Sequence, residues 1–122
     1  MLDKSRSGTE AAMQAGVDCR PGCPVARTAD VISGKWTTLI IRELLSGTKR
    51  YTELQHALLG VSPKVLAQRL KMLEEAGLVI RTLYPAVPPR TDYRLTDLGR
   101  ALEPVVRAMA EFGLRLAAAE EG

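Results

Sequence analysis

The chain has 122 residues, of which 46% are hydrophobic and 25% are charged, and its formal net charge is +3. This length and composition fit one globular domain and argue against two. No stretch approaches the roughly 18 consecutive apolar residues of a membrane span, and the N-terminus lacks the apolar run of a signal peptide. The two cysteines are too few for a disulfide scaffold. We therefore expect a cytoplasmic protein without a membrane partner.

Positive charge is concentrated in the middle of the chain. The segment from Lys49 to Arg100 carries nine basic and five acidic residues, which is a larger excess than that of the whole chain. A local basic excess is typical of surfaces that bind nucleic acid. A solvated surface of mixed charge has the same composition, so the interpretation depends on the motifs within the segment.

Residues 1–18 are small and polar, and we expect either a disordered segment or an arm that orders against a partner. We expect residues 19–122 to form the folded domain. Its first helix is predicted from Cys23 to Gly34, because Pro24 suits the first helical position and Cys23 then becomes the N-cap. Apolar residues recur at helical spacing through this segment, at Val25, Ala29 and Ile32.

A longer helix is predicted from Lys35 to Ser46, with Gly47 as its stop signal. One apolar stripe runs along this helix and contains Trp36, Leu39, Ile40 and Leu44. Trp36 is the largest apolar side chain of the stripe, so we expect it to anchor the core.

Two further helices are predicted on either side of a tight turn at residues 60–61. The first spans Tyr51 to Leu59 and is predicted to face inward with Leu54, Ala57 and Leu58. The second begins with Ser62 as N-cap and Pro63 at the first helical position, and it is predicted to run to about Ala76. Its apolar stripe is formed by Leu66, Leu70 and Leu73.

After Gly77 the spacing of apolar residues changes from 3.6 to 2, which is the period of a strand. Residues 78–84 and 90–95 are therefore predicted to be strands. The proline-rich residues 85–89 cannot sit in a central strand, so they form the loop between the two. The sequence predicts a β-hairpin with a proline-rich tip.

A long final helix is predicted to begin at Thr96 or Asp97, and Pro104 should kink or break it locally. Its apolar face contains Leu98, Leu102, Val105, Met109, Phe112 and Leu116. This stripe is longer than a three-helix core needs, and an exposed stripe of that size usually marks an interface. The alternative is that it folds back on its own core. The candidate residues of a dimer interface are Leu102, Val105, Val106, Met109, Phe112 and Leu116.

The order of short helix, tight turn, capped helix and hairpin is that of a winged helix-turn-helix. The predicted fold class is mainly α with a small β-hairpin, and the domain is expected to dimerise through the apolar face of its final helix. In such a motif the second helix enters the major groove of DNA. A homodimer would read a palindromic operator in double-stranded DNA, with half-sites about 34 Å apart.

The solvent face of the capped helix fits this role. Lys64, Gln68 and Lys71 fall on one stripe opposite the leucines. The amide of glutamine can bind an adenine edge, and Arg69 can bind guanine or phosphate. Ser62 and Lys64 can donate to phosphates, and a helix N-terminus itself favours a phosphate. A solvated polar face is the ordinary alternative for any one of these residues.

Basic residues outside the capped helix extend the candidate surface. Arg90 follows the hairpin loop and can reach the minor groove or the flanking backbone. Lys49 and Arg50 precede the short helix and can clamp a phosphate. The full set of candidate DNA-binding residues is Lys49, Arg50, Ser62, Pro63, Lys64, Gln68, Arg69, Lys71 and Arg90.

Several runs of residues resemble the HxlR-type winged-helix regulators of bacteria: 23–25, 34–37, 41–47, 61–70, 73–79, 84–90 and 93–99. The resemblance covers about residues 23–113, which is most of the chain. It implies a homodimeric transcriptional regulator whose terminal helices form the dimer interface. Several members of the family respond to oxidants or electrophiles through a cysteine near the N-terminus, and Cys23 matches that position.

A cysteine at a helix N-terminus has a lowered thiol pKa, because the helix dipole stabilises the thiolate. Our hypothesis is that oxidation of Cys23 changes the placement of the two DNA-reading helices. Its partner can be Cys19, the Cys23 of the other subunit or a small thiol. The alternative is an inert, packed cysteine. A zinc site is not expected, because Cys19, Cys23 and the single His56 do not make a four-ligand set.

Other function classes find little support in the sequence. It contains no glycine-rich phosphate loop, no Ser-His-Asp set and no metal-binding histidine pair, so we expect neither an enzyme nor a cofactor. Two alternatives stay open. The winged helix can serve as a protein-interaction module, or the regulator can respond to a small-molecule effector without a thiol switch.

Overall fold

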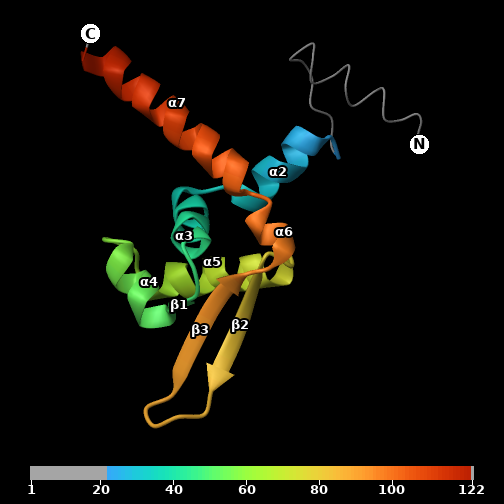
Figure 1. Ribbon diagram of the computed structural model, residues 1–122, viewed down its shortest axis with the longest axis vertical. Helices are drawn as coiled ribbons and strands as arrows, with labels where there is room; N and C mark the ends of the chain where they lie inside the picture. The colour runs from blue at the N-terminus through green and yellow to red at the C-terminus, as the bar shows by residue number, and fades with distance from the viewer. Residues whose placement is uncertain (1–21, 122) are drawn as a thin grey trace. The chain divides into compact units, whose positions relative to one another are not determined.

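The computed structural model describes residues 22–121, and the chain divides into two compact units after Ser33. In the first unit the described residues form helix α2, Pro24–Ile32 (Figure 1). Pro24 occupies its first turn, and the Cys23 side chain caps it by accepting the Ala26 N–H at 3.3 Å. The predicted helix and its cap are confirmed. The predicted boundary between residues 18 and 19, and Cys19 itself, lie outside the described residues.

The second unit begins with three helices and a short strand. Helix α3 spans Lys35–Leu45, strand β1 Lys49–Arg50, helix α4 Tyr51–Ala57 and helix α5 Pro63–Glu75. Strand β1 was not predicted, because two residues are too few to show a period. The predicted helices agree with the observed ones to within two residues at each end.

The wing and the C-terminal helices complete this unit. Strands β2, Val79–Tyr84, and β3, Arg90–Leu95, form the predicted hairpin, and the sheet has the order β1-β3-β2 with antiparallel pairing throughout. Helix α6 spans Asp97–Arg100 and helix α7 spans Glu103–Glu121. In Figure 1 the hairpin and α7 leave the unit at opposite ends.

The predicted effect of Pro104 is confirmed as a break between two helices rather than a bend within one. Pro104 lies in the first turn of α7, where a missing N–H breaks no intrahelical bond. Leu98 therefore belongs to α6 and is exposed, so its predicted place on the stripe of the long helix is wrong.

The core lies where α3, α4 and α5 pack against the sheet. Its members are Ile40, Ile41, Leu44, Leu54, Leu58, Val61, Leu66, Leu70, Leu73, Leu78, Val79, Tyr93 and Leu95. Two sequence-based expectations about it are wrong. Trp36 is only half-buried, with the Lys35 ammonium 4.6 Å from its ring centroid, so it borders the core rather than anchoring it. Ala57 is exposed, because α4 is short and buries only Leu54, followed by Leu58 just beyond its end. None of the described helices is both long and apolar enough to cross a membrane.

Candidate nucleic-acid interface

Helix α5 has a buried face and an exposed face, as the second helix of a helix-turn-helix requires. The Ser62 hydroxyl accepts the Val65 N–H at 3.1 Å, which satisfies one of the free donors of the first turn. Leu66, Leu70 and Leu73 are each at most 1% exposed and fix the helix against the core. The opposite face is left in solvent and carries Lys64, Gln68 and Lys71, all of them exposed.

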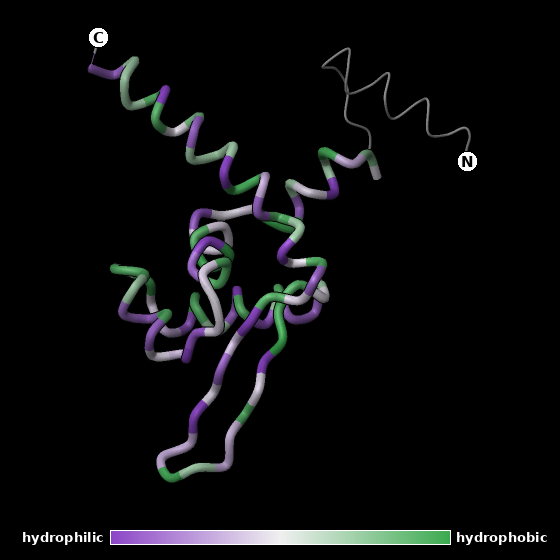
Figure 2. Tube along the Cα trace, viewed as in Figure 1, coloured by the Kyte–Doolittle hydropathy of each residue, from purple (hydrophilic) through white to green (hydrophobic). Residues whose placement is uncertain are grey.

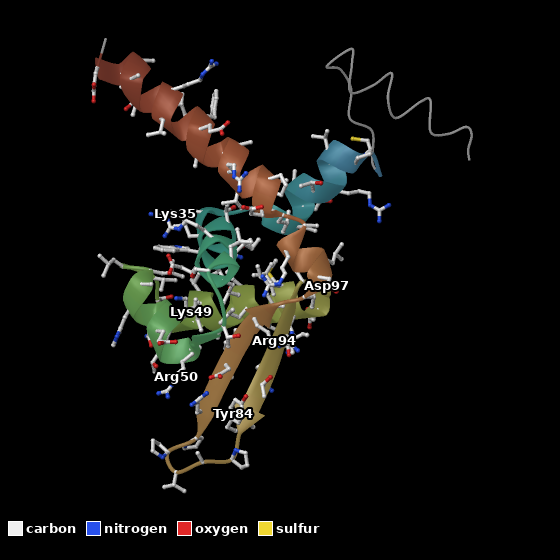
Figure 3. All side chains as sticks on the ribbon, viewed as in Figure 1. Lys35, Lys49, Arg50, Tyr84, Arg94 and Asp97 are labelled. Carbon is white, nitrogen blue, oxygen red and sulfur yellow. The ribbon has the colours of Figure 1, made fainter. Side chains whose placement is uncertain are left out.

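The start of α4 is held beside the start of α5. The Tyr51 hydroxyl donates to the Pro63 carbonyl at 3.3 Å, across a separation of twelve residues. Lys49 and Arg50 directly precede Tyr51, so both are carried toward the N-terminal end of α5; Figure 3 labels them at the start of α4. Tyr51 was not named from the sequence, because a single tyrosine at a helix start carries no local signal for this contact.

Arg50 also sets the beginning of α4. Its backbone N–H donates to the Glu53 carboxylate at 2.7 Å, which is half of a capping box. Its side chain is not used in that bond, and the residue is exposed. The predicted role of Arg50 as a phosphate contact is therefore compatible with its structural role.

Arg69 is placed differently from the other candidate residues of α5. Its guanidinium lies against Gly34, where an added Cβ would be 3.6 Å from the nearest nitrogen. Among the described residues, the buried Arg69 Nε has no hydrogen-bond partner. The side chain thus turns toward the start of α3 and away from the face of Lys64 and Gln68. Its predicted contact with guanine or phosphate does not fit this orientation, because helical geometry puts position 69 beside the leucine stripe.

The wing positions Arg90 at the base of its loop. Arg90 Nε and one terminal nitrogen donate to the two carboxylate oxygens of Asp92 at 3.0 and 2.9 Å. The guanidinium carbon lies 4.9 Å from the ring centroid of Tyr84, which pairs with Arg90 across the hairpin. The hydrogen bonds from Arg90 hold the pKa of the Asp92 carboxyl below its usual value of 3.8, and Asp92 in turn raises the pKa of Arg90. Sequence reasoning missed Asp92.

Helix α7 presents an apolar face that the described structure leaves uncovered. Val105, Met109, Phe112 and Leu116 line one open groove along it, and no residue of α7 is buried. Figure 2 shows hydrophobic and hydrophilic residues alternating along this helix. The other two candidate interface residues, Leu102 and Val106, are half-buried at its start and do not line the groove.

Cys23 is half-buried and disulfide-bonded, and its sulfur is also the N-cap acceptor of α2. The other half of the disulfide lies outside the described residues. Within residues 22–121 there is no group of three or more histidine, cysteine, aspartate or glutamate side chains that could hold a metal ion.

Residues 31–121 match the model of the HxlR-like helix-turn-helix family. An HTH-type transcriptional regulator of Synechocystis sp. is 43% identical over 91 residues, covering 75% of this chain and 67% of that protein. A MarR-family transcriptional regulator from Porphyromonas gingivalis W83 superposes with a TM-score of 0.77 at 40% identity, covering 80% of this chain and 96% of the other.

A redox regulator, HypR, is also similar. Its oxidised form superposes with a TM-score of 0.71 at 40% identity, covering 76% of this chain and 96% of the other. The Synechocystis and Porphyromonas relatives are regulators of transcription, which is not a catalytic function. This chain is therefore a DNA-binding transcriptional regulator that belongs to the HxlR-like helix-turn-helix family.

Proposed function

We propose that this regulator binds a palindromic operator in double-stranded DNA as a homodimer, and that the oxidation state of Cys23 controls the binding. The observation that carries the operator proposal is the exposed face of α5. Lys64, Gln68 and Lys71 project from a helix whose other side is anchored by three buried leucines. A rigid helix with one polar face can enter the major groove without distortion.

The three side chains are proposed to contact different parts of the duplex. Gln68 lies between the two lysines and can pair with an adenine edge through its amide. Lys64 lies in the first turn of α5, where the helix dipole also favours a phosphate. Lys71 lies two turns further and is the outermost phosphate contact of the helix. Lys49 and Arg50, next to the start of α4, extend the contact along the backbone of the duplex.

The dimer is proposed to form through the groove on α7. Met109 is 43% exposed, Phe112 60% and Leu116 49%, so three large apolar side chains of one groove lie in water in the isolated chain. A second copy of the same helix would cover them, because a two-fold interface needs one self-complementary patch. Two α5 helices would then be related by the same axis as the operator.

The proposed switch rests on the double role of the Cys23 sulfur. The atom is a disulfide partner and also the acceptor for the first turn of α2. Oxidation by diamide removes one hydrogen from each of two thiols, joins the two sulfurs and leaves the reduced hydrazine. The cap is present in the disulfide-bonded state, and we expect reduction of the bond to release the sulfur and alter the first turn of α2. The similarity to a redox regulator supports the proposal.

The test is a titration of the reduced protein into labelled duplex from its own upstream region, at two salt concentrations. We expect tight binding that weakens steeply with salt, because phosphate contacts release counterions. Lys64→Ala and Lys71→Ala should each lower the salt slope by about one, whereas Gln68→Ala should lower the preference for the operator over unrelated DNA. Arg69→Ala is the matched control on the same helix and should leave the salt slope unchanged.

The thiol arm repeats the titration after diamide treatment, with Cys23→Ser as the control variant. Loss of binding in the wild type but not in Cys23→Ser would support the switch. An affinity that diamide does not change would contradict the proposed switch and point to a small-molecule effector instead. Absence of any sequence preference in either oxidation state would contradict the operator proposal and favour a protein-interaction role.

A further inference from the structure

Asp92 is a nearly buried carboxylate within the surface proposed to face DNA. Its side chain is 10% exposed, whereas the side chain of its partner Arg90 is 42% exposed. A negative charge close to a polyanion should weaken binding by simple electrostatics. The position of Asp92 therefore calls for another explanation.

The pairing of the strands shows which side chains surround this carboxylate. Asp92 is paired with Arg50 on β1 and with Thr82 on β2. Directly paired residues share a face of the sheet, as do residues two apart along a strand. Arg50, Arg90 and Arg94 therefore lie on the same face as Asp92. Figure 3 labels Arg94 near the base of the hairpin and Tyr84 near its tip.

Two carboxylates stand beside the three guanidinium groups: Asp92 itself, and Glu53, which accepts the Arg50 backbone N–H and acts electrostatically on Arg90. Three positive and two negative charges leave the cluster with a net positive charge. Asp92 is also the most buried of these groups, since the three arginines and Glu53 are all exposed. A phosphate approaching the sheet thus meets the arginines first, and Asp92 lies behind them.

The contacts of Arg90 restrict it to one orientation. Two of its five N–H groups are used in the fork with Asp92. Its plane is supported by the Tyr84 ring, with the guanidinium carbon 4.9 Å from the ring centroid. The remaining N–H groups stay available to an outside acceptor, and the side chain does not need to be ordered when that acceptor binds.

We propose that Asp92 is a positioning residue, which holds Arg90 as a preoriented clamp for a DNA backbone phosphate. The clamp is assigned to the backbone rather than to a base, because the fork with Asp92 and the contact with Tyr84 hold Arg90 at the base of the loop. The inference deepens the proposed function and rests on the binding of DNA. It assigns the wing a role in affinity and leaves sequence preference to α5.

The experiment compares Asp92→Asn with Asp97→Asn in the reduced protein, using the operator duplex. Both variants remove one negative charge, but Asp97 is an exposed residue of α6. We expect Asp92→Asn to weaken operator binding about tenfold, the range for losing an oriented charge-assisted contact. Asp97→Asn should leave the affinity unchanged or slightly higher. Asp92→Asn binding as tightly as the wild type, or more tightly, would overturn the proposal.

Arg90 variants separate positioning from a purely structural role. Arg90→Lys keeps the charge but cannot make a two-pronged contact, and it should lose as much affinity as Asp92→Asn. In an Arg90→Ala background the substitution Asp92→Asn should have no further effect, because the group it positions is gone. Independent, additive losses would contradict the clamp. If Asp92→Asn does not fold, the affinity of Arg90→Lys still tests whether the oriented two-pronged contact contributes to binding.

Base-substituted duplexes test the assignment to the backbone. With base pairs replaced on both flanks of the half-sites, Arg90→Lys and Asp92→Asn should lose the same factor of affinity as on the original operator. A loss confined to one flanking sequence would show base reading by the wing and overturn the phosphate assignment. If the wild-type protein binds no DNA at all, the proposed function fails. That outcome differs from an equal loss on all duplexes and from a loss confined to one flanking sequence.

Discussion

Helices α5 and α7 are both amphipathic, yet they place their apolar faces in opposite environments. The leucine stripe of α5 is removed from water by α3 and the sheet, and each of its three members is at most 1% exposed. The apolar face of α7 contains equally large side chains, but none of its residues is buried. The comparison shows that a hydrophobic stripe favours burial but does not determine which element or which chain covers it.

The difference has a structural cause at the α6–α7 junction. Pro104 ends the possibility of one continuous helix, and α7 continues away from the sheet as Figure 1 shows. It contacts α3 at most over a small part of its length. The stripe of α5 therefore serves the stability of the single chain, and the stripe of α7 is the one that the proposed dimer would bury.

The largest effect is expected from a cavity in the α5 stripe. Leu70→Ala should lower the free energy of unfolding by about 2–5 kcal/mol, since a buried leucine is removed from a packed core. Met72→Ala lies on the same helix but is exposed, and it should change stability by no more than about 0.5 kcal/mol. Urea denaturation measures both. Equal effects of the two variants would contradict the distinction between the faces of α5.

A charge on the α7 face should act on assembly rather than on folding. Phe112→Asp should raise the dissociation constant of the dimer at least about 100-fold, because the interface would bury an unpaired carboxylate. Leu114→Asp is the matched control, since Leu114 is exposed and does not line the groove. Sedimentation velocity over a concentration series reads out both. A wild-type protein that stays monomeric would leave the α7 stripe without its proposed partner.

Two glycine-to-alanine substitutions, each of which adds one methyl group, compare how closely the packed unit and α7 are surrounded by other atoms. A Cβ at Gly99 would collide with the Leu78 carbonyl oxygen, so Gly99→Ala should cost about 1–3 kcal/mol of stability. A Cβ at Gly113, on α7, would meet nothing within 4 Å, so Gly113→Ala should gain up to about 1 kcal/mol from helix propensity. Both are best measured by thermal unfolding in the Phe112→Asp background, where the proposed α7 interface would not form. A destabilising Gly113→Ala there would mean that α7 packs more closely than the structure describes.

The smallest effect is expected from the pH dependence of the wing. The pKa of Asp92 is lowered by its hydrogen bonds from Arg90, so the contribution of this pair is present above pH 3.8 and is lost as the pH falls through the lower pKa of the folded state. The stability difference between the wild type and Asp92→Asn should therefore shrink below pH 3.8. Urea titrations across acidic pH measure it, and a difference that grows on acidification would contradict the assigned sign.

The sequence by itself determined the elements whose signals are local. The Ser62-Pro63 cap, the change of period after Gly77 and the break at Pro104 all depend on residues within a few positions of one another. Each therefore acts before any tertiary contact exists. The same local rules placed Lys64, Gln68 and Lys71 on one face of α5.

Only the tertiary structure decided which side chains meet. Strand β1 exists because β3 offers it partners. Trp36 lies in the first turn of α3 and only borders the core, whereas Ile40 and Ile41, further along the same helix, are fully buried. Arg69 turns toward Gly34, a residue 35 positions earlier, and no local pattern reports such a contact. The local period of two already puts Arg90 and Asp92 on one face of β3, but the Tyr84 ring reaches the Arg90 guanidinium only through the register of the hairpin. Pairings of this kind depend on long-range packing, which composition and periodicity do not contain.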